Sequence, residues 1–232
     1  MPIPLSFTEP ALAFRCAGAP VEARPSGALW LPQARALVVA DLHLGKAERL
    51  ARRGGALLPP YEVEETLRRL ELEIAATAPE TVVALGDSFD DPAAAAALPT
   101  PARARLAALA ERRRWVWVEG NHDPCACAAW GETVAELRLG GLVLRHLPSP
   151  GAAPGEAAGH LHPKAALVLR GRKVARRCFV EDGSRLLLPA FGAYAGGLWA
   201  QDPAVAGLMG PRARALLLGR RVTPAPLAAL AA

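Results

Sequence analysis

Three short apolar runs in the first half of the chain each lead into a cluster of side chains that can bind metal ions. The runs are Ala36–Ala40, Thr81–Leu85 and Trp115–Val118. The clusters that follow them are Asp41-Leu42-His43, Gly86-Asp87 and Gly120-Asn121-His122-Asp123. Helical patterns separate the runs, which is typical of strands that alternate with helices in a parallel sheet. Because the carboxyl ends of neighbouring parallel strands lie at one edge of the sheet, we expect the three clusters to converge there.

The stretches between these runs predict helices. A short helical stretch covers Lys46–Arg53 and closes at two glycines. A longer helix is expected after Pro59-Pro60 to about Ala76, because apolar residues recur there at helical spacing. A third helix is expected from about Pro101 to Arg112, and a further strand, Ala28–Leu31, precedes the first run. The first half therefore predicts a β-α-β-α-β arrangement.

From residue 134 onwards the pattern changes to short apolar runs with glycine-rich turns and little helix. The predicted strands are Val134–Leu139, Leu142–Leu147, Ala165–Leu169, Val174–Val180 and Arg185–Leu188. His146 lies at the end of one run, the cluster Gly159-His160-Leu161-His162 lies in a loop before another, and Phe191–Trp199 is a glycine-rich aromatic loop. These runs favour a mixed or antiparallel second sheet that stacks on the first. With 232 residues and no internal repeat, we expect one domain over residues 1–232.

All five histidines of the chain belong to these clusters, so none is left for an ordinary surface or core role. Together with carboxylates and one amide oxygen they form a donor set for a pair of divalent cations. The candidate ligands are Asp41, His43, Asp87, Asn121, His146, His160 and His162. Residues two apart at a strand end point to the same side, so Asp41 and His43 can bind one cation. In their loop, His160 and His162 can face two adjacent cations, and Asp87 can bridge both.

Two divalent cations about 3.5–4 Å apart hold a phosphoryl group and a hydroxide for in-line attack, which predicts phosphoester hydrolysis. His122 follows the candidate ligand Asn121 but cannot easily share its cation, so it is the candidate general acid for the leaving oxygen. Asp90 or Asp123 is expected to hold the His122 imidazole charged and oriented. Each cluster alone is more typical of a turn or a polar contact, and only the full ordered set favours a metal centre.

The basic residues are bunched, and the formal net charge is +5. One bunch directly follows the first cluster, and we expect it to lie near the site and attract substrate phosphates. The candidate substrate-binding residues are Lys46, Arg49, Arg52 and Arg53, together with Asn121. A solvated surface explains such bunches equally well. Charge therefore permits a polyanionic substrate but does not establish one.

Membrane and redox signals are weak. No apolar run approaches the roughly 18–20 residues of a membrane-spanning helix. Residues 1–4 contain no basic region of a secretory signal, so we expect a cytoplasmic protein with no membrane partner. Cys125-Ala126-Cys127 lies just beyond the third cluster, but a C-x-C pair alone is a poor indicator of a metal or redox site. Reduced thiols are the expected state.

The order Asp-x-His, Gly-Asp, Gly-Asn-His-Asp, His and Gly-His-x-His resembles the calcineurin-like metallophosphoesterase superfamily, from about Trp30 to His162. The resemblance implies a four-layer α-β-β-α sandwich, in which helices flank two mixed β-sheets and a dinuclear metal site lies at strand C-terminal ends. It implies one cation bound by Asp41, His43, Asp87 and His162. It implies the other bound by Asp87, Asn121, His146 and His160. It also implies His122 as the acid beside the phosphate, and two manganese ions as the usual metals, with iron or zinc as alternatives. Asp90 matches the second aspartate of a Gly-Asp-x-x-Asp block, which orients the histidine in phosphoprotein phosphatases of this superfamily.

A narrower resemblance, to the bacterial ligase-associated DNA damage response endonucleases, spans most of the chain. The matching segments are Ala40–Lys46, Leu85–Phe89, Gly120–Pro124, Gly159–Pro163, Arg177–Val180, Leu188–Gly192 and Gly196–Leu198. This resemblance implies DNA as the substrate and repair proteins such as a ligase, helicase or exonuclease as partners. Many relatives carry a histidine at the position of Asp90, which leaves the orientation of His122 open in this chain.

These observations favour a metal-dependent phosphodiesterase that acts on DNA as a repair endonuclease, with a metal-bridging hydroxide as nucleophile and His122 as general acid. A second interpretation is hydrolysis of small phosphodiesters or phosphomonoesters such as cyclic nucleotides, which needs a closed pocket instead of an open basic groove. A third is a non-catalytic DNA-repair scaffold, but a scaffold needs no leaving-group acid. Folds of this kind act on many substrates, so the site defines the reaction class better than the substrate.

Overall fold

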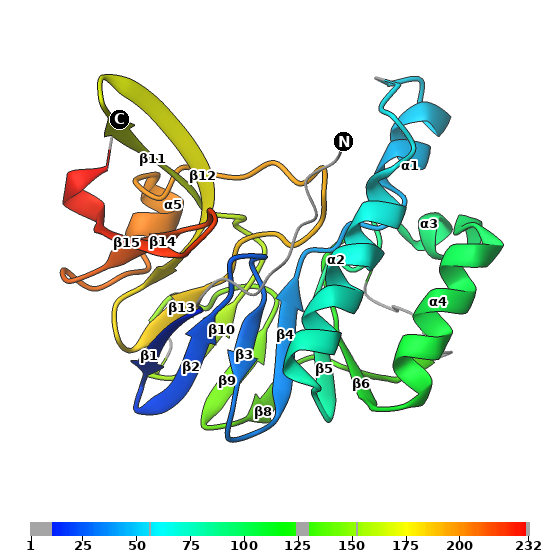
Figure 1. Ribbon diagram of the computed structural model, residues 1–232, viewed down its shortest axis with the longest axis horizontal. Coiled ribbons are helices and arrows are strands. Elements are labelled where there is room, and N and C mark those ends of the chain that lie inside the picture. Colours follow the sequence, from blue (N-terminus) through cyan, green and yellow to red (C-terminus); the bar gives the residue numbers. More distant parts are fainter. Residues whose placement is uncertain (1–10, 56, 124–129, 152, 231–232) are drawn as a thin grey trace.

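Two β-sheets lie face to face, and helices cover the outer side of the first sheet (Figure 1). The computed structural model describes residues 11–55, 57–123, 130–151 and 153–230. The first sheet has seven strands in the order β1-β2-β3-β4-β5-β6-β7. These strands are β1 Leu12–Cys16, β2 Ala19–Ala23, β3 Leu29–Leu31, β4 Ala36–Ala40, β5 Thr81–Leu85, β6 Arg114–Val118 and β7 Glu132–Val134.

The first sheet changes from antiparallel to parallel pairing at β4. Strands β1 to β4 pair antiparallel, and β4 to β7 pair parallel. In this parallel part Ala40 pairs with Leu85, and Leu85 pairs with Val118, so the three strands end at one level. The three polar clusters therefore leave the sheet at the same edge, as the sequence predicts.

The helices that connect the parallel strands pack on one face of the first sheet. They are α1 Lys46–Arg52, α2 Glu62–Thr77, α3 Pro92–Ala97 and α4 Thr100–Glu111. The predicted apolar face of α2, which includes Leu67 and Leu70, is buried against sheet residues such as Val39 and Trp117. Asp91 starts α3 by accepting a hydrogen bond from the main-chain N–H of Ala94. Burial of these apolar faces is what holds the strand ends in place.

The second sheet has eight strands, in the order β15-β14-β12-β13-β10-β9-β8, with β11 paired to β12. They are β8 Leu137–Leu139, β9 Leu142–Arg145, β10 Glu156–Ala158, β11 Lys164–Leu169, β12 Arg172–Glu181, β13 Arg185–Leu187, β14 Arg214–Leu217 and β15 Thr223–Pro226. Strand β10 is parallel to both of its neighbours, and the other pairs are antiparallel. The sheet is therefore mixed.

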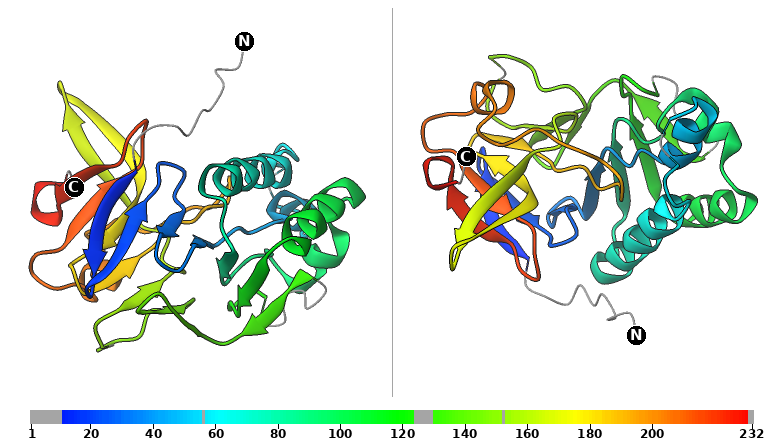
Figure 2. Two further views of the ribbon diagram at one scale, coloured as in Figure 1. Left: turned by 60° about the horizontal axis from the view of Figure 1, so that its bottom comes forward. Right: turned by 90° about the horizontal axis from the view of Figure 1, so that it is seen from above.

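A core of buried apolar residues joins the two sheets, with Val38, Leu85 and Val116 from the first and Leu144 and Phe179 from the second. The outer face of the second sheet packs on two short helices, α5 Pro203–Ala206 and η2 Leu227–Ala229. The views in Figure 2 show the same order of layers, with the long helices on one side only. The predicted α/β class with two mixed sheets is confirmed. The fourth layer is slighter than expected, because four-residue and three-residue helices form it in the described part of the chain.

Two strand predictions need correction. The predicted strand Val134–Leu139 is wrong as one element, because the chain leaves the first sheet after β7 and enters the second at β8. Glu136 lies at this crossing and forms an ion pair with Arg145. The predicted strand Leu142–Leu147 ends earlier, at Arg145, which turns His146 out of the sheet. Strands β1, β2, β10, β14 and β15 were not predicted.

Candidate metal centre

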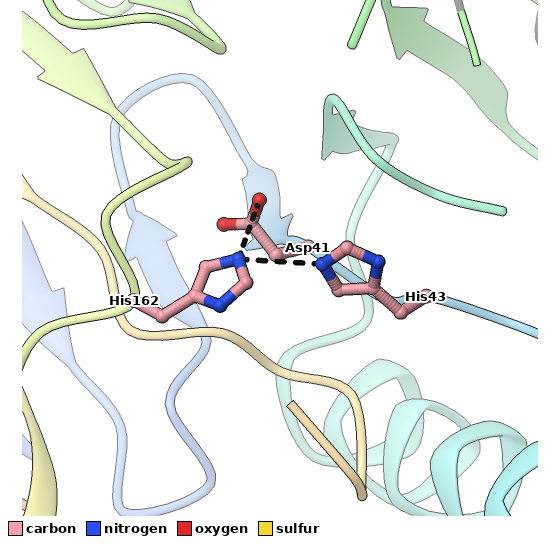
Figure 3. A group of neighbouring side chains, drawn as sticks. All are labelled: Asp41, His43 and His162. Atoms are coloured by element: carbon pink, nitrogen blue, oxygen red, sulfur yellow. Dashed lines mark hydrogen bonds and ion pairs between the residues drawn. The ribbon is translucent and has the colours of Figure 1, made fainter. Parts of the chain in front are cut away.

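Asp41, His43 and His162 form the first group of candidate ligands (Figure 3). Asp41 and His43 follow β4, and His162 precedes β11 in the second sheet. The Nε2 atom of His162 lies 3.2 Å from Oδ1 of Asp41 and 3.3 Å from Nε2 of His43. Asp41 and His43 are buried, and the His162 side chain is 15% exposed. The group therefore combines one carboxylate and two imidazoles from both sheets.

Asp87, His146 and His160 form the second group. Nε2 of His146 lies 3.4 Å from Oδ2 of Asp87 and 3.2 Å from Nδ1 of His160. The amide oxygen of Asn121 lies 2.9 Å from the same Nε2 atom. The two groups are adjacent, because Nδ1 of His146 also lies 3.6 Å from Oδ1 of Asp41. The structure thus brings together all seven residues predicted as ligands.

These distances fit the divalent cations that the donor set predicts. Ligand atoms that bind one cation at about 2.1 Å lie roughly 3.0–3.4 Å from one another. The separations within both groups match this spacing. In the first group, His162 lies 3.2 Å from Asp41 and 3.3 Å from His43. In the second group, His146 lies 3.4 Å from Asp87 and 3.2 Å from His160. Two imidazoles and a carboxylate whose ligand atoms all lie within 4.8 Å of one another are suited to Mn²⁺, Fe²⁺ or Zn²⁺.

The backbone at the candidate ligands is strained. Five of them have positive φ angles: Asp41 at 53°, His43 at 44°, Asp87 at 43°, His160 at 68° and His162 at 47°. Residues with a Cβ atom seldom adopt this left-handed conformation, and each such position costs of order 1–3 kcal/mol. Main-chain hydrogen bonds hold it here, since the N–H groups of Asp41 and His43 donate to the carbonyls of Gly86 and Asp87. Strain that clusters in this way is typical of functional sites.

Two glycines let the clusters approach one another. Gly86 has a φ of +72°, and a Cβ atom there would lie 2.3 Å from the ring of His146. A Cβ atom at Gly120 would lie 2.1 Å from the main-chain nitrogen of Asp87. Any larger residue would therefore push Asp87 and His146 apart. The glycines that precede Asp87 and Asn121 are part of the geometry of the site.

Asp87 is held as a carboxylate. Burial works to raise its pKa, but the hydrogen bond and charge of His146 and the main-chain N–H of His122 together lower the pKa of Asp87 to about 2. That N–H lies 2.9 Å from Oδ1 of Asp87. Conversely, His146 gains affinity for a proton, because the nearby Asp87 and Asp41 raise its pKa against the effect of burial. An anionic Asp87 is the form that binds metal.

Asp90 contacts His43 through its carboxylate and His122 through its main chain. Its Oδ1 lies 2.9 Å from Nδ1 of His43 and 4.0 Å from Nζ of Lys46, and its Oδ2 pairs with Arg49. Burial works to raise the pKa of Asp90, but His43 and Arg49 lower it to about 2. Its main-chain carbonyl lies 3.0 Å from Nδ1 of His122. The sequence suggested that a carboxylate orients His122, whereas here a main-chain carbonyl does so.

Asp123, the other residue predicted to orient His122, has different contacts. Its Oδ2 accepts the main-chain N–H of Phe89 at 2.9 Å, and its Oδ1 has no hydrogen-bond partner within the described residues. Burial, and then the charge of Asp87, raise the pKa of Asp123 to about 6. Pro124 and the predicted thiol pair Cys125 and Cys127 lie outside the described residues.

His122 is a partly exposed histidine at the edge of the site. Its side chain is 38% exposed, and its Nε2 lies 3.9 Å from Oδ2 of Asp87. Its ring meets that of His43 edge to face, with centroids 5.4 Å apart. Because the Asp90 carbonyl fixes Nδ1, the opposite nitrogen faces the two ligand groups. His122 thus lies beside the candidate metal centre.

The basic residues predicted to bind substrate lie on and just after α1, but they differ in availability. Arg49 is paired with Asp90, and Arg52 pairs with Glu48 and Asp91. Lys46 lies at the edge of the Asp90 pair, with its side chain 22% exposed. Arg53 is 61% exposed and lies 3.7 Å from Asp91. Arg53 and Lys46 are therefore better placed than Arg49 to meet a phosphate.

Two arginines behind the site, the buried Arg69 and the half-buried Arg177, were not predicted from the sequence. Arg69 donates to the carbonyls of Ser26 and Phe191, and Arg177 donates to those of Ala190, Phe191 and Gly192. Burial, followed by repulsion between the two guanidinium groups, lowers the pKa of Arg69 to about 10. The main-chain N–H of Gly192 donates to the carbonyl of Asp41, so both arginines support that ligand. An arginine within an amphipathic helix pattern gives no sign of this role.

Comparison with known proteins places the chain in a family. The model of calcineurin-like phosphoesterases matches residues 34–176, which include all seven candidate ligands. The chain belongs to this family. It is a metal-dependent hydrolase of phosphoesters, as the metal-binding clusters predict.

Two solved structures are similar to this chain. A nuclease from Pseudomonas putida, called MPE, is 31% identical, with a TM-score of 0.72, and the match covers 93% of this chain and 100% of that one. A phosphoesterase from E. coli, Yfce, is 19% identical, with a TM-score of 0.40, and the match covers 70% of this chain and 83% of that one. No curated protein sequence gave a match. No helix in the described part of the chain has the length and apolar character needed to span a bilayer.

Proposed function

We propose that the two groups bind two divalent cations, one at Asp41, His43 and His162 and the other at Asp87, His146 and His160. Asn121 completes the second site, since its amide oxygen lies 2.9 Å from the candidate ligand atom of His146. Asp87, which is held as a carboxylate beside both groups, would help to hold the cations. Manganese is the expected metal. Imidazole nitrogens combined with carboxylate oxygens also accept iron or zinc.

The chain's own residues position the substrate and supply a proton. Bound divalent cations contribute Lewis-acid chemistry and lower the pKa of water, which is the basis of phosphoester hydrolysis at neutral pH. The Asp90 carbonyl holds Nδ1 of His122, so that Nε2 is directed towards the leaving oxygen. His122 then donates its proton to that oxygen as a general acid. Its exposed side chain meets a substrate that arrives from solvent.

DNA is the proposed substrate, and endonucleolytic cleavage is the proposed reaction. The similarity to a nuclease over almost the whole chain supports this, as does the net charge of +5. A cleft of about 490 Å³ opens to solvent beside Asn121 and His146, so the site is accessible to a polymer. A cyclic nucleotide needs a closed pocket instead.

The observation that carries this proposal is the meeting of the two ligand groups at one sheet edge. We also propose that residues 1–232 form one domain, since the core between the sheets runs from Cys16 to Val222. A role in DNA repair beside a ligase, helicase or exonuclease stays a prediction, and so does a cytoplasmic location.

The test uses Mn²⁺-loaded protein against circular single-stranded DNA, linear duplex DNA, a cyclic nucleotide and bis(p-nitrophenyl) phosphate. Cutting of closed circles is the expected result, and turnover of small esters alone would contradict it. His122→Ala should keep both cations and lose about 10²–10⁴-fold in turnover on DNA. It should lose far less on the aryl diester, whose leaving group needs no acid. Equal losses on both substrates would contradict the acid role.

A further inference from the structure

Trp199 is an exposed aromatic side chain on the segment that runs beside the metal centre. Its indole is 39% exposed, and the neighbouring Leu198 is 36% exposed. The main-chain N–H of Leu198 donates to the carbonyl of Leu161, and the N–H of Lys164 donates to the carbonyl of Leu198. A bridge pairs Trp199 with Lys164, two residues beyond His162. The main chain at Trp199 is therefore held beside Lys164, about 7 Å along the chain from the candidate ligand His162.

The segment that contains Trp199 packs closely against the candidate metal centre. A Cβ atom at Gly197 would lie 1.9 Å from the main-chain carbonyl oxygen of His162. The loop thus packs directly on the main chain of that ligand, and its aromatic residue faces outwards. A rigid and exposed indole in this place is suited to contact a molecule bound at the cations.

Two lysines lie against the indole. Nζ of Lys164 is 4.8 Å from the ring centroid, and Nζ of Lys173 is 5.2 Å from it. Both belong to the β11–β12 hairpin, which extends beyond the second sheet (Figures 1 and 2). The same hairpin carries further cations at Arg170, Arg172 and Arg176. Lysine Nζ atoms at these distances form cation–π pairs, which are weak at exposed sites.

Ligand binding explains the pairs between the two lysines and the indole better than packing of the loop alone. A tryptophan that served only to pack the loop would bury its ring, yet more than a third of this one remains exposed. Cations that flank an exposed aromatic ring are typical of surfaces for single-stranded nucleic acid. There, a base stacks on the ring and the cations pair with the flanking phosphates.

We propose that Trp199, Lys164 and Lys173 bind one unpaired nucleotide of the DNA strand that is cut at the metal centre. The base stacks on the indole and displaces a lysine side chain, which then pairs with a neighbouring phosphate. A base inside a duplex has no free face, so this contact favours single-stranded or frayed DNA. The proposal rests on DNA as the substrate of the metal centre.

The test compares Trp199→Ala with Trp199→Phe in Mn²⁺-loaded protein. For single-stranded DNA, Trp199→Ala should raise KM about tenfold with little change in kcat, because stacking stabilises the bound strand. Trp199→Phe should restore most of the loss, since phenylalanine keeps a stacking face. The KM for duplex DNA and the hydrolysis of bis(p-nitrophenyl) phosphate should not change. Val168→Ala, which removes an exposed apolar side chain from the same hairpin, is the matched control.

The lysines have a separate readout. Lys164→Gln combined with Lys173→Gln should reduce the salt dependence of single-strand binding by about two phosphate contacts. If the protein cuts DNA and Trp199→Ala keeps the wild-type KM for single-stranded DNA, the stacking site alone is refuted. A protein that hydrolyses the aryl diester and cuts neither form of DNA would refute both this site and DNA as the substrate.

Discussion

Replacement of Asp90 should weaken metal binding at the first group, although Asp90 is not itself a candidate ligand. The Asp90 carboxylate is 1% exposed and lies 2.9 Å from Nδ1 of His43, whose other nitrogen faces His162. A carboxylate on the far nitrogen of a ligating histidine fixes the ring and makes it a stronger ligand. Asp90→Asn keeps an acceptor for His43 but removes the charge. Asp90→Ala removes both.

The expected magnitude follows from these contacts. Loss of such a partner lowers metal affinity about 10–100-fold, so Asp90→Asn should lie near the low end and Asp90→Ala near the high end. Removal of one member of a buried ion pair costs about 3–5 kcal/mol. Arg49 and Lys46 retain 18% and 22% exposure, so water compensates part of that cost. We therefore expect about 2 kcal/mol of destabilisation, or roughly 4–8 °C in Tm.

The assay is Mn²⁺ titration followed by calorimetry and by the EPR signal of free Mn²⁺. A His160→Ala background disables the second group and isolates binding at the first, and a His162→Ala background does the reverse. Asp91→Asn is the matched control, because it removes a neighbouring carboxylate that pairs with Arg52 and can still cap α3. Unchanged affinity at the first group, or an equal loss at the second, would refute the reasoning.

Four further predictions concern the frame around the site. Gly120→Ala should abolish binding at the second group, because its Cβ atom would lie 2.1 Å from the nitrogen of Asp87; Mn²⁺ calorimetry would show this, and wild-type affinity would contradict it. Asp182 accepts hydrogen bonds from the main-chain N–H groups of Ser184, Arg185 and Gly210, which lower its pKa against the effect of burial. Its contribution is complete above the ordinary pKa of 3.8 and is lost as the pH falls through the lowered folded value. Urea unfolding should therefore show that Asp182→Ala costs about 1–2 kcal/mol at pH 7, after allowance for solvent, and progressively less as the pH falls below 3.8. Burial raises the pKa of Cys16 and Cys178 to about 12, so mass spectrometry should find both unalkylated by iodoacetamide at pH 8 until the protein is unfolded. Removal of the cations with EDTA should lower the free energy of unfolding by about 2.7 kcal/mol for each bound cation, relative to protein in metal at 100 times Kd. An unchanged melting curve would contradict metal binding to the folded state.

The sequence indicated the candidate ligands through chemistry and strand order more than through local geometry. Spacing by two residues placed Asp41 and His43 on one side, as in a continuing strand. The structure instead has both in the left-handed conformation, with φ angles of 53° and 44°. Their convergence with Asp87 comes from the level ends of β4 and β5. The structure therefore brings the predicted residues together, but on a backbone that the two-residue spacing did not predict.

What the sequence could not predict depends on contacts between distant segments. Strand β10 begins with Glu156, a residue uncommon in buried strands, and is stabilised there by Arg145 and Arg185 at 3.6 Å and 3.4 Å. No local pattern indicates such a strand. The orientation of His122 by a carbonyl was equally hidden, because a main-chain acceptor leaves no trace in residue identity. Because sequence motifs consist of side chains, they suggested the carboxylate of Asp90 or Asp123 as the group that orients His122.

Main-chain hydrogen bonds between the clusters explain how the strained ligands stay in register before any cation binds. The N–H of His160 donates to both oxygens of Asp41, at 3.2 Å and 3.0 Å, and joins the last cluster to the first. The N–H of His122 donates to Asp87 and joins the third cluster to the second. Each carboxylate thus uses one face for a neighbouring backbone and keeps lone pairs for a metal. These bonds join protein groups to one another, so they contribute to ordering the donors that the proposed cations would bind.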